Sequence, residues 1–119
     1  MSMKAKNRHV DAVTIIDLSG RITLGEDLAE LRQMIRNLLA QGQKQILLDL
    51  GDVTYIDSSG IGELVSGFTA VSNQGGQLKL LNLTKRVHDL LQITKLLTVF
   101  EVYDDEPTAI ASFHKAAGA

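Results

Sequence analysis

The chain of 119 residues is predicted to fold as a single α/β domain with a mixed, mostly parallel central sheet. Apolar runs of strand length alternate with segments in which apolar residues recur every three or four positions, the pattern of amphipathic helices. Each strand–helix unit spans about thirty residues, which is typical of right-handed crossovers between parallel strands. We therefore expect about four or five strands and about four helices, with the core at about residues 8–115 and short tails on both sides.

The first third of the chain predicts a strand or hairpin followed by a helix. Residues 10–18, VDAVTIIDL, are rich in β-branched residues. Lys4, Lys6 and Arg8 precede them and are interpreted as a solvated polar tail. Thr23 and Glu26 have the spacing of a capping box, which predicts a helix start there. The expected helix carries Leu28, Leu31, Ile35 and Leu38 on one face and ends at Gly42.

The rest of the chain continues the alternation. Residues 45–50, QILLDL, read as a central strand, and residues 52–56 lead directly into a helix whose apolar positions are Ile61, Leu64, Val65, Phe68 and Val71. A strand is expected at residues 77–81, a helix capped by Thr84 after it, and another strand at residues 99–103. Pro107 suits the first position of a last helix, and residues 116–119 are expected to fray.

Composition excludes several classes of function. Twelve basic and fourteen acidic residues leave a net charge of −2, so the chain lacks the positive charge of a nucleic-acid binder. It has no cysteine, and its histidines and carboxylates show no metal-ligand spacing, so neither a metal nor any other cofactor is expected. No apolar run is long enough for direct membrane insertion. We expect a cytoplasmic protein that is a monomer or a weak dimer.

The most informative segment is YIDSSGIG at residues 55–62, where an acid and two hydroxyls lie at a strand-to-helix junction. One interpretation is purely structural: Asp57 or Ser58 caps the helix, worth about 1 kcal/mol. The other is functional: a phosphate on a hydroxyl at the N-terminus of a helix would be stabilised by the positive end of the helix dipole. A serine hydrolase is disfavoured, since Ser58 lacks the G-x-S-x-G elbow and no spacing singles out a base among His9, His88 and His114.

This segment, within GDVTYIDSSGIGELV at residues 51–65, resembles the signature of bacterial anti-sigma-factor antagonists of the STAS superfamily. The turn at Gly20, GGQLKLLNLT at residues 75–84 and VHDLLQITKLLTVFEVYD at residues 87–104 are similar to that family as well. The resemblance implies a non-enzymatic regulator whose unphosphorylated form binds an anti-sigma factor that is also a serine kinase, and so releases a sigma factor. Phosphorylation by that kinase reverses the binding, and a serine phosphatase restores it.

The resemblance also implies which residues act. Ser58 corresponds to the phosphoacceptor, with Ser59 as second choice. The expected partner-binding residues are Leu24, Asp57, Ser58, Ser59, Gly60, Ile61 and Gly62. Among them, Asp57 would position the loop, the two glycines would let the partner approach the backbone, and Leu24 and Ile61 would be apolar contacts.

Two features leave alternatives open. Where known antagonists carry an acidic residue shortly after the glycine of the first turn, this chain has Thr23, for which a structural role in the capping box is favoured over a partner contact. A different class of function is also compatible with the fold. The domain would then be a non-switching scaffold subunit of a signalling complex or of a membrane lipid-transport complex.

Overall fold

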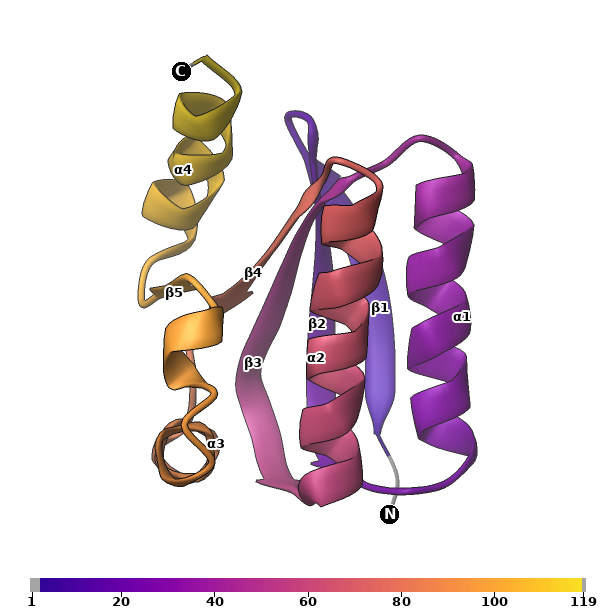
Figure 1. Ribbon diagram of the computed structural model, residues 1–119, viewed down its shortest axis with the longest axis vertical. Coiled ribbons are helices and arrows are strands. Elements are labelled where there is room, and N and C mark those ends of the chain that lie inside the picture. The colour runs from indigo at the N-terminus through magenta and orange to yellow at the C-terminus, as the bar shows by residue number, and fades with distance from the viewer. Residues whose placement is uncertain (1–2, 119) are drawn as a thin grey trace.

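The computed structural model describes residues 3–118 (Figure 1). These residues form a sheet with the strand order β1-β2-β3-β4-β5, in which β1 is antiparallel to β2 and the other neighbours are parallel. The strands are β1 (Lys4–Val10), β2 (Val13–Ile22), β3 (Gln45–Ile56), β4 (Gln77–Leu81) and β5 (Val102–Tyr103). The helices are α1 (Glu26–Ala40), α2 (Ser58–Asn73), α3 (Lys85–Ile93) and α4 (Glu106–Gly118), with a 3-10 turn at Leu97–Val99. The predicted α/β class and element numbers are confirmed.

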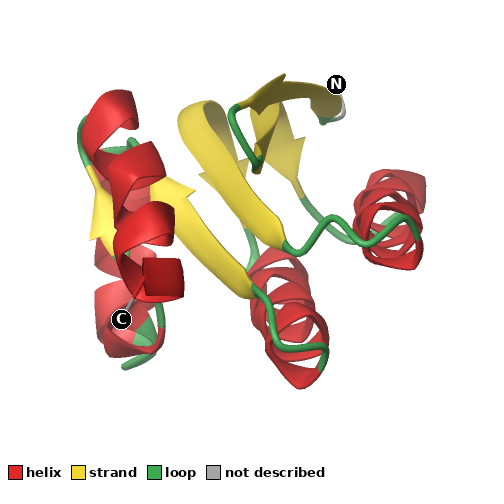
Figure 2. Cartoon of the chain, turned by 90° about the horizontal axis from the view of Figure 1, so that it is seen from above, coloured by secondary structure: helices red, strands yellow, loops and turns green. Residues whose placement is uncertain are grey.

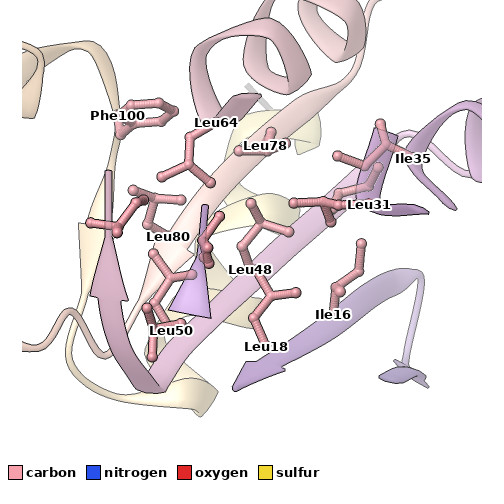
Figure 3. Packing of buried hydrophobic residues seen from close by; sticks show 14 of the residues in the cluster. Ile16, Leu18, Leu31, Ile35, Leu48, Leu50, Leu64, Leu78, Leu80 and Phe100 are labelled. Carbon is pink, nitrogen blue, oxygen red and sulfur yellow. The ribbon is translucent and has the colours of Figure 1, made fainter. Parts of the chain in front are cut away.

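Alternation along the central strands divides the core between the two faces of the sheet. Ile16 and Leu48 belong to the larger cluster, which also includes side chains of α1, α2 and α3 and is shown in Figure 3. Their neighbours Ile15 and Leu47 face the other side and pack with Phe113 of α4. Figure 2 shows the sheet between α1 and α4. Both faces of β3 are therefore covered, as its nearly continuous apolar sequence predicts.

Residues 4–10 form a strand of the sheet and not a solvated tail, so that expectation was wrong. Lys4 and Arg8 lie in β1, which forms a hairpin with β2. Arg8 Nε is 2.7 Å from Asp17 Oδ2, and Arg8 Nη1 donates to Glu106 Oε2 of α4 at 3.1 Å. Met3, just before the strand, is buried in the larger cluster. The charged residues of β1 are therefore compatible with a strand because Arg8 has partners on both β2 and α4.

The capping box predicted at Thr23 and Glu26 does not form. Helix α1 begins at Glu26 after Gly25, whose φ of 146° lies in a region that favours glycine, and no side chain caps the helix. The backbone N–H of Leu24 donates instead to Asp57 Oδ2 across the molecule. A tertiary hydrogen bond and a glycine turn therefore shape this loop, in place of a local cap.

The caps of the later helices agree better with the sequence. Thr84 Oγ1 accepts from the N–H of Val87, which confirms the cap predicted for α3. Helix α4 begins at Glu106, one residue before Pro107, and extends to Gly118. Residue 119 lies outside the described residues. No helix among residues 3–118 combines the length and the apolar character needed to cross a bilayer.

The small cluster under α4 predicts a large cost for removing its main side chain. Phe113 is fully buried, so Phe113→Ala should lower the free energy of unfolding by about 3–5 kcal/mol. Urea denaturation measures this. The matched control is Ile93→Ala, because Ile93 is 77% exposed and its loss should cost less than about 0.5 kcal/mol. Equal losses for the two variants would contradict the assignment of α4 to a second core.

The ion pair between β1 and α4 predicts a pH dependence. The hydrogen bond from Arg8 lowers the pKa of Glu106 below its ordinary value, so the charged carboxylate stabilises the fold above about pH 4.3 and this contribution is lost as the pH falls further. Glu106→Gln should therefore be less stable than the wild type at pH 7, and the difference should shrink at pH 3. Urea unfolding at both values tests it. Glu30→Gln, on the exposed face of α1, should keep the wild-type pH dependence.

Candidate functional site

Asp57 joins two loops at the end of the sheet where β3 leads into α2. Its Oδ1 accepts from the N–H of Gly60 at 2.8 Å and so caps α2, which confirms the structural role predicted for this residue. Its Oδ2 accepts from the N–H of Leu24 at 3.3 Å. Its own N–H donates to the carbonyl of Ile22 at 3.2 Å. The β2–α1 loop and the start of α2 are therefore bound together by one residue.

Ser58 is the first residue of α2 and its side chain is exposed. Asp57 caps α2, so the hydroxyl of Ser58 is not needed as the helix cap. Within residues 3–118, the Ser58 hydroxyl makes no hydrogen bond. Ser59 is half-buried. Of the two hydroxyls, Ser58 is therefore the more accessible.

Two of the predicted partner-binding residues lie inside the protein. A Cβ on Gly60 would be 2.4 Å from the carbonyl oxygen of Ile22, so this glycine is required by the close approach of α2 to β2. Ile61 is only 4% exposed and packs in the larger core. Their assignment as partner contacts is corrected on this ground. Leu24, in contrast, is 78% exposed, and a Cβ on Gly62 would meet open space.

A groove of about 800 Å³ lies beside Ser58. One wall is formed by residues 55–58, and the other by residues of α3, namely Lys85, Arg86, Asp89, Leu90 and Ile93. Figure 1 shows α3 at the same end of the molecule as the start of α2. Neither Tyr55 nor any residue of α3 was among the expected partner-binding residues. The topology could have indicated α3: β3 and β4 are parallel neighbours, so the segments that follow them, which begin α2 and α3, lie at the same edge of the sheet.

Charged side chains of both signs line this groove: the carboxylates of Asp57 and Asp89, and the cations of Lys85 and Arg86. The guanidinium groups of Arg21 and Arg86 lie 4.4 Å and 4.6 Å from the centre of the Tyr55 ring. Lys85 Nζ donates to Asp89 Oδ2 at 2.8 Å, and this hydrogen bond lowers the pKa of the Asp89 carboxyl and raises that of Lys85. Asp89 is therefore ionised at neutral pH and neutralised by its partner on the same helix.

The arrangement is that of a binding surface. Within residues 3–118, no three His, Asp or Glu side chains lie close enough together to hold a metal ion. The histidines considered as bases for Ser58 have other neighbours: His9 contacts Thr14, His88 contacts Asp89 and His114 lies near Asp11. An exposed hydroxyl, a shallow groove and exposed apolar side chains are the features that a protein partner can contact.

Known proteins resemble the chain in sequence and in fold. The anti-sigma F factor antagonist of Paenibacillus polymyxa is 26% identical over 110 residues, which are 92% of this chain and 94% of that protein. The crystal structure of TM1081 from Thermotoga maritima has a TM-score of 0.85 at 25% identity, covering 92% of this chain and 94% of that one.

The Bacillus protein SpoIIAA has the same fold in both of its solved forms. The unphosphorylated form has a TM-score of 0.79 at 21% identity and covers 98% of each chain. The phosphorylated form has a TM-score of 0.74 at 21% identity and covers 92% of this chain and 98% of its own. The model of the STAS domain family matches residues 4–109, which include every strand of the sheet and the start of α2 with Ser58, and the chain is therefore a member of the STAS domain family.

Proposed function

We propose that this protein is an anti-sigma-factor antagonist switched by phosphorylation at Ser58. The unphosphorylated form binds an anti-sigma factor that is also a serine kinase, and a sigma factor is released. Phosphorylation of Ser58 by that kinase ends the binding, and a serine phosphatase restores the active form. The protein acts in the bacterial cytoplasm as a binding regulator and not as an enzyme.

The observation that carries the proposal is that Asp57 and Ser58, which are adjacent, have different roles. Asp57 caps α2, while Ser58 is exposed and makes no hydrogen bond among the described residues. A kinase can therefore reach and modify the Ser58 oxygen without removing an interaction that the fold needs. The relatives support this proposal, because one is named an antagonist of an anti-sigma factor and SpoIIAA exists in a phosphorylated form.

Electrostatics explains how a phosphate would act as the switch. It adds about 1.5 to 2 negative charges, and the positive end of the α2 dipole tolerates them at this position. In a docked complex the same charge would have to lose its water, which is costly unless the partner supplies a cation. A change of a few kcal/mol in binding free energy is enough to move a complex from mostly bound to mostly free. The domain itself need not change shape.

A charged substitution at Ser58 should reproduce the phosphorylated state. Ser58→Asp should weaken binding to the purified cognate anti-sigma factor kinase at least about tenfold, equivalent to about 1.4 kcal/mol, while Ser58→Ala should bind like the wild type. Isothermal titration calorimetry measures the affinities. Incubation with the kinase and ATP should add one phosphate, located at Ser58 by mass spectrometry and lost in Ser58→Ala.

The matched control is Ser66→Asp, which makes the same change at an exposed position further along α2 and should leave binding unchanged. Normal binding by Ser58→Asp would contradict the switch. A phosphate located only at Ser59 would move the acceptor by one residue and would also overturn the assignment. Stable association with other components, without any modification, would instead favour a scaffold subunit of a signalling or lipid-transport complex.

Stability should respond little to changes at Ser58. The sequence allowed a cost of about 1 kcal/mol for Ser58→Ala through loss of a cap, but the cap is Asp57. Thermal and urea unfolding should therefore place Ser58→Ala within about 0.5 kcal/mol of the wild type, whereas Asp57→Ala should lose about 1 kcal/mol or more. A larger loss of stability for Ser58→Ala than for Asp57→Ala would show that Ser58 contributes to the stability of the fold.

A further inference from the structure

Two arginines from different elements share one tyrosine ring beside the proposed switch residue. Tyr55 lies near the end of β3, and Arg21 of β2 is its partner in the sheet register. Arg86 comes from the start of α3. Their guanidinium groups are 4.4 Å and 4.6 Å from the ring centre. The ring therefore fixes the positions of two cations that would otherwise be on flexible, solvated side chains.

Among the described residues, neither Arg21 nor Arg86 has a carboxylate partner, in contrast to Arg8 and Arg32. Arg8 pairs with Asp17 and Glu106, and Arg32 pairs with Glu63. Within the described part of the chain, no ion pair or hydrogen bond involves the guanidinium of Arg21 or Arg86. A guanidinium that stacks through its face keeps its N–H edges available, and these edges match the two oxygens of a carboxylate.

The cluster of Arg21, Tyr55 and Arg86 borders the surface proposed to meet the partner. Tyr55 and Arg86 line the same groove as Ser58. The groove also contains Ile93, one of the most exposed large apolar side chains, and Leu24 lies on the loop bound to Asp57. Tyrosine and arginine are residue types enriched in protein-binding hot spots.

We propose that the cluster of Arg21, Tyr55 and Arg86 receives a carboxylate of the anti-sigma factor kinase that docks at Ser58. This inference rests on the proposed function and adds the chemistry of the partner: its docking face carries Asp or Glu where it meets the groove. Two unpaired cations on one ring are complementary to an acidic face and repel a basic one.

The proposed pairing also strengthens the argument for the direction of the switch. A phosphate on Ser58 places negative charge in the groove into which the partner brings its own carboxylate. Like-charge repulsion then adds to the cost of desolvating the phosphate. Only the unphosphorylated form would then bind the partner, in agreement with the proposed function.

Charge reversal in the cluster tests the inference with the purified cognate kinase as the probe. Arg21→Glu and Arg86→Glu should each weaken binding at least about tenfold, and the milder Arg86→Gln should weaken it less. Isothermal titration calorimetry at low and high salt should show that the wild type loses affinity with salt and that the double variant Arg21→Gln, Arg86→Gln loses most of this dependence. Urea unfolding should show that all the variants are folded.

Lys44→Glu is the matched control. Lys44 is exposed and precedes β3, at the opposite end of that strand from Ser58, so the same reversal of charge should change the affinity less than about twofold. A second arm reverses the partner: replacing the kinase carboxylate by Arg should restore binding to Arg86→Glu and weaken binding to the wild type.

The outcomes separate the two proposals. If the wild type does not bind the kinase at all, both the proposed function and the carboxylate contact are wrong. If the wild type binds and is phosphorylated at Ser58, but folded Arg21→Glu and Arg86→Glu bind as tightly as Lys44→Glu does, only the carboxylate contact is overturned.

Discussion

The site depends on the two carboxylate oxygens of Asp57. One oxygen caps α2 through the N–H of Gly60, and the other accepts from the N–H of Leu24 in the β2–α1 loop. The backbone N–H of the same residue donates to Ile22, and Gly60 is so close to Ile22 that a Cβ there would clash with its carbonyl. Ser58 therefore projects from a junction whose backbone is fixed on both sides, while its own hydroxyl is left out of the network.

A rigid backbone with an exposed hydroxyl suits the proposed role of Ser58, which a kinase must recognise and which a docked partner would cover. The surface around Ser58 combines exposed Leu24 and Ile93 with guanidinium groups that Tyr55 positions. Ordering these groups before docking reduces the conformational entropy lost on binding. In the proposed complex the apolar side chains would contribute affinity, whereas the arginines would select an acidic face. Specificity and switching would then reside in the same small area.

The parts of the structure predicted correctly from sequence are those set by local patterns. The 3.6-residue period of α1, the apolar run of β3 and the Thr84 cap are readable from adjacent residues. The incorrect predictions concern residues whose conformation or role depends on contacts with residues distant in the sequence. Arg8 lies in a strand that pairs with β2, and its side chain contacts Glu106, 98 positions away. The capping box expected at Thr23 is replaced by a hydrogen bond from Leu24 to Asp57. The role of Gly60 likewise depends on Ile22, and the grouping of cations on Tyr55 requires the sheet register.

Charges that stabilise the fold and charges that surround the site belong to different parts of the molecule. Lys79 is 2% exposed, and its Nζ donates to Ser112 of α4 at 2.9 Å and lies 3.3 Å from Glu101. With Arg8 and its carboxylates, this network binds α4 to the sheet on the face remote from the larger cluster. Negative charge added at Ser58 therefore meets the exposed end of α2 and the groove, where water screens it in the free protein. It becomes costly only when a partner excludes that water, so a charge can control docking without unfolding the domain that displays it.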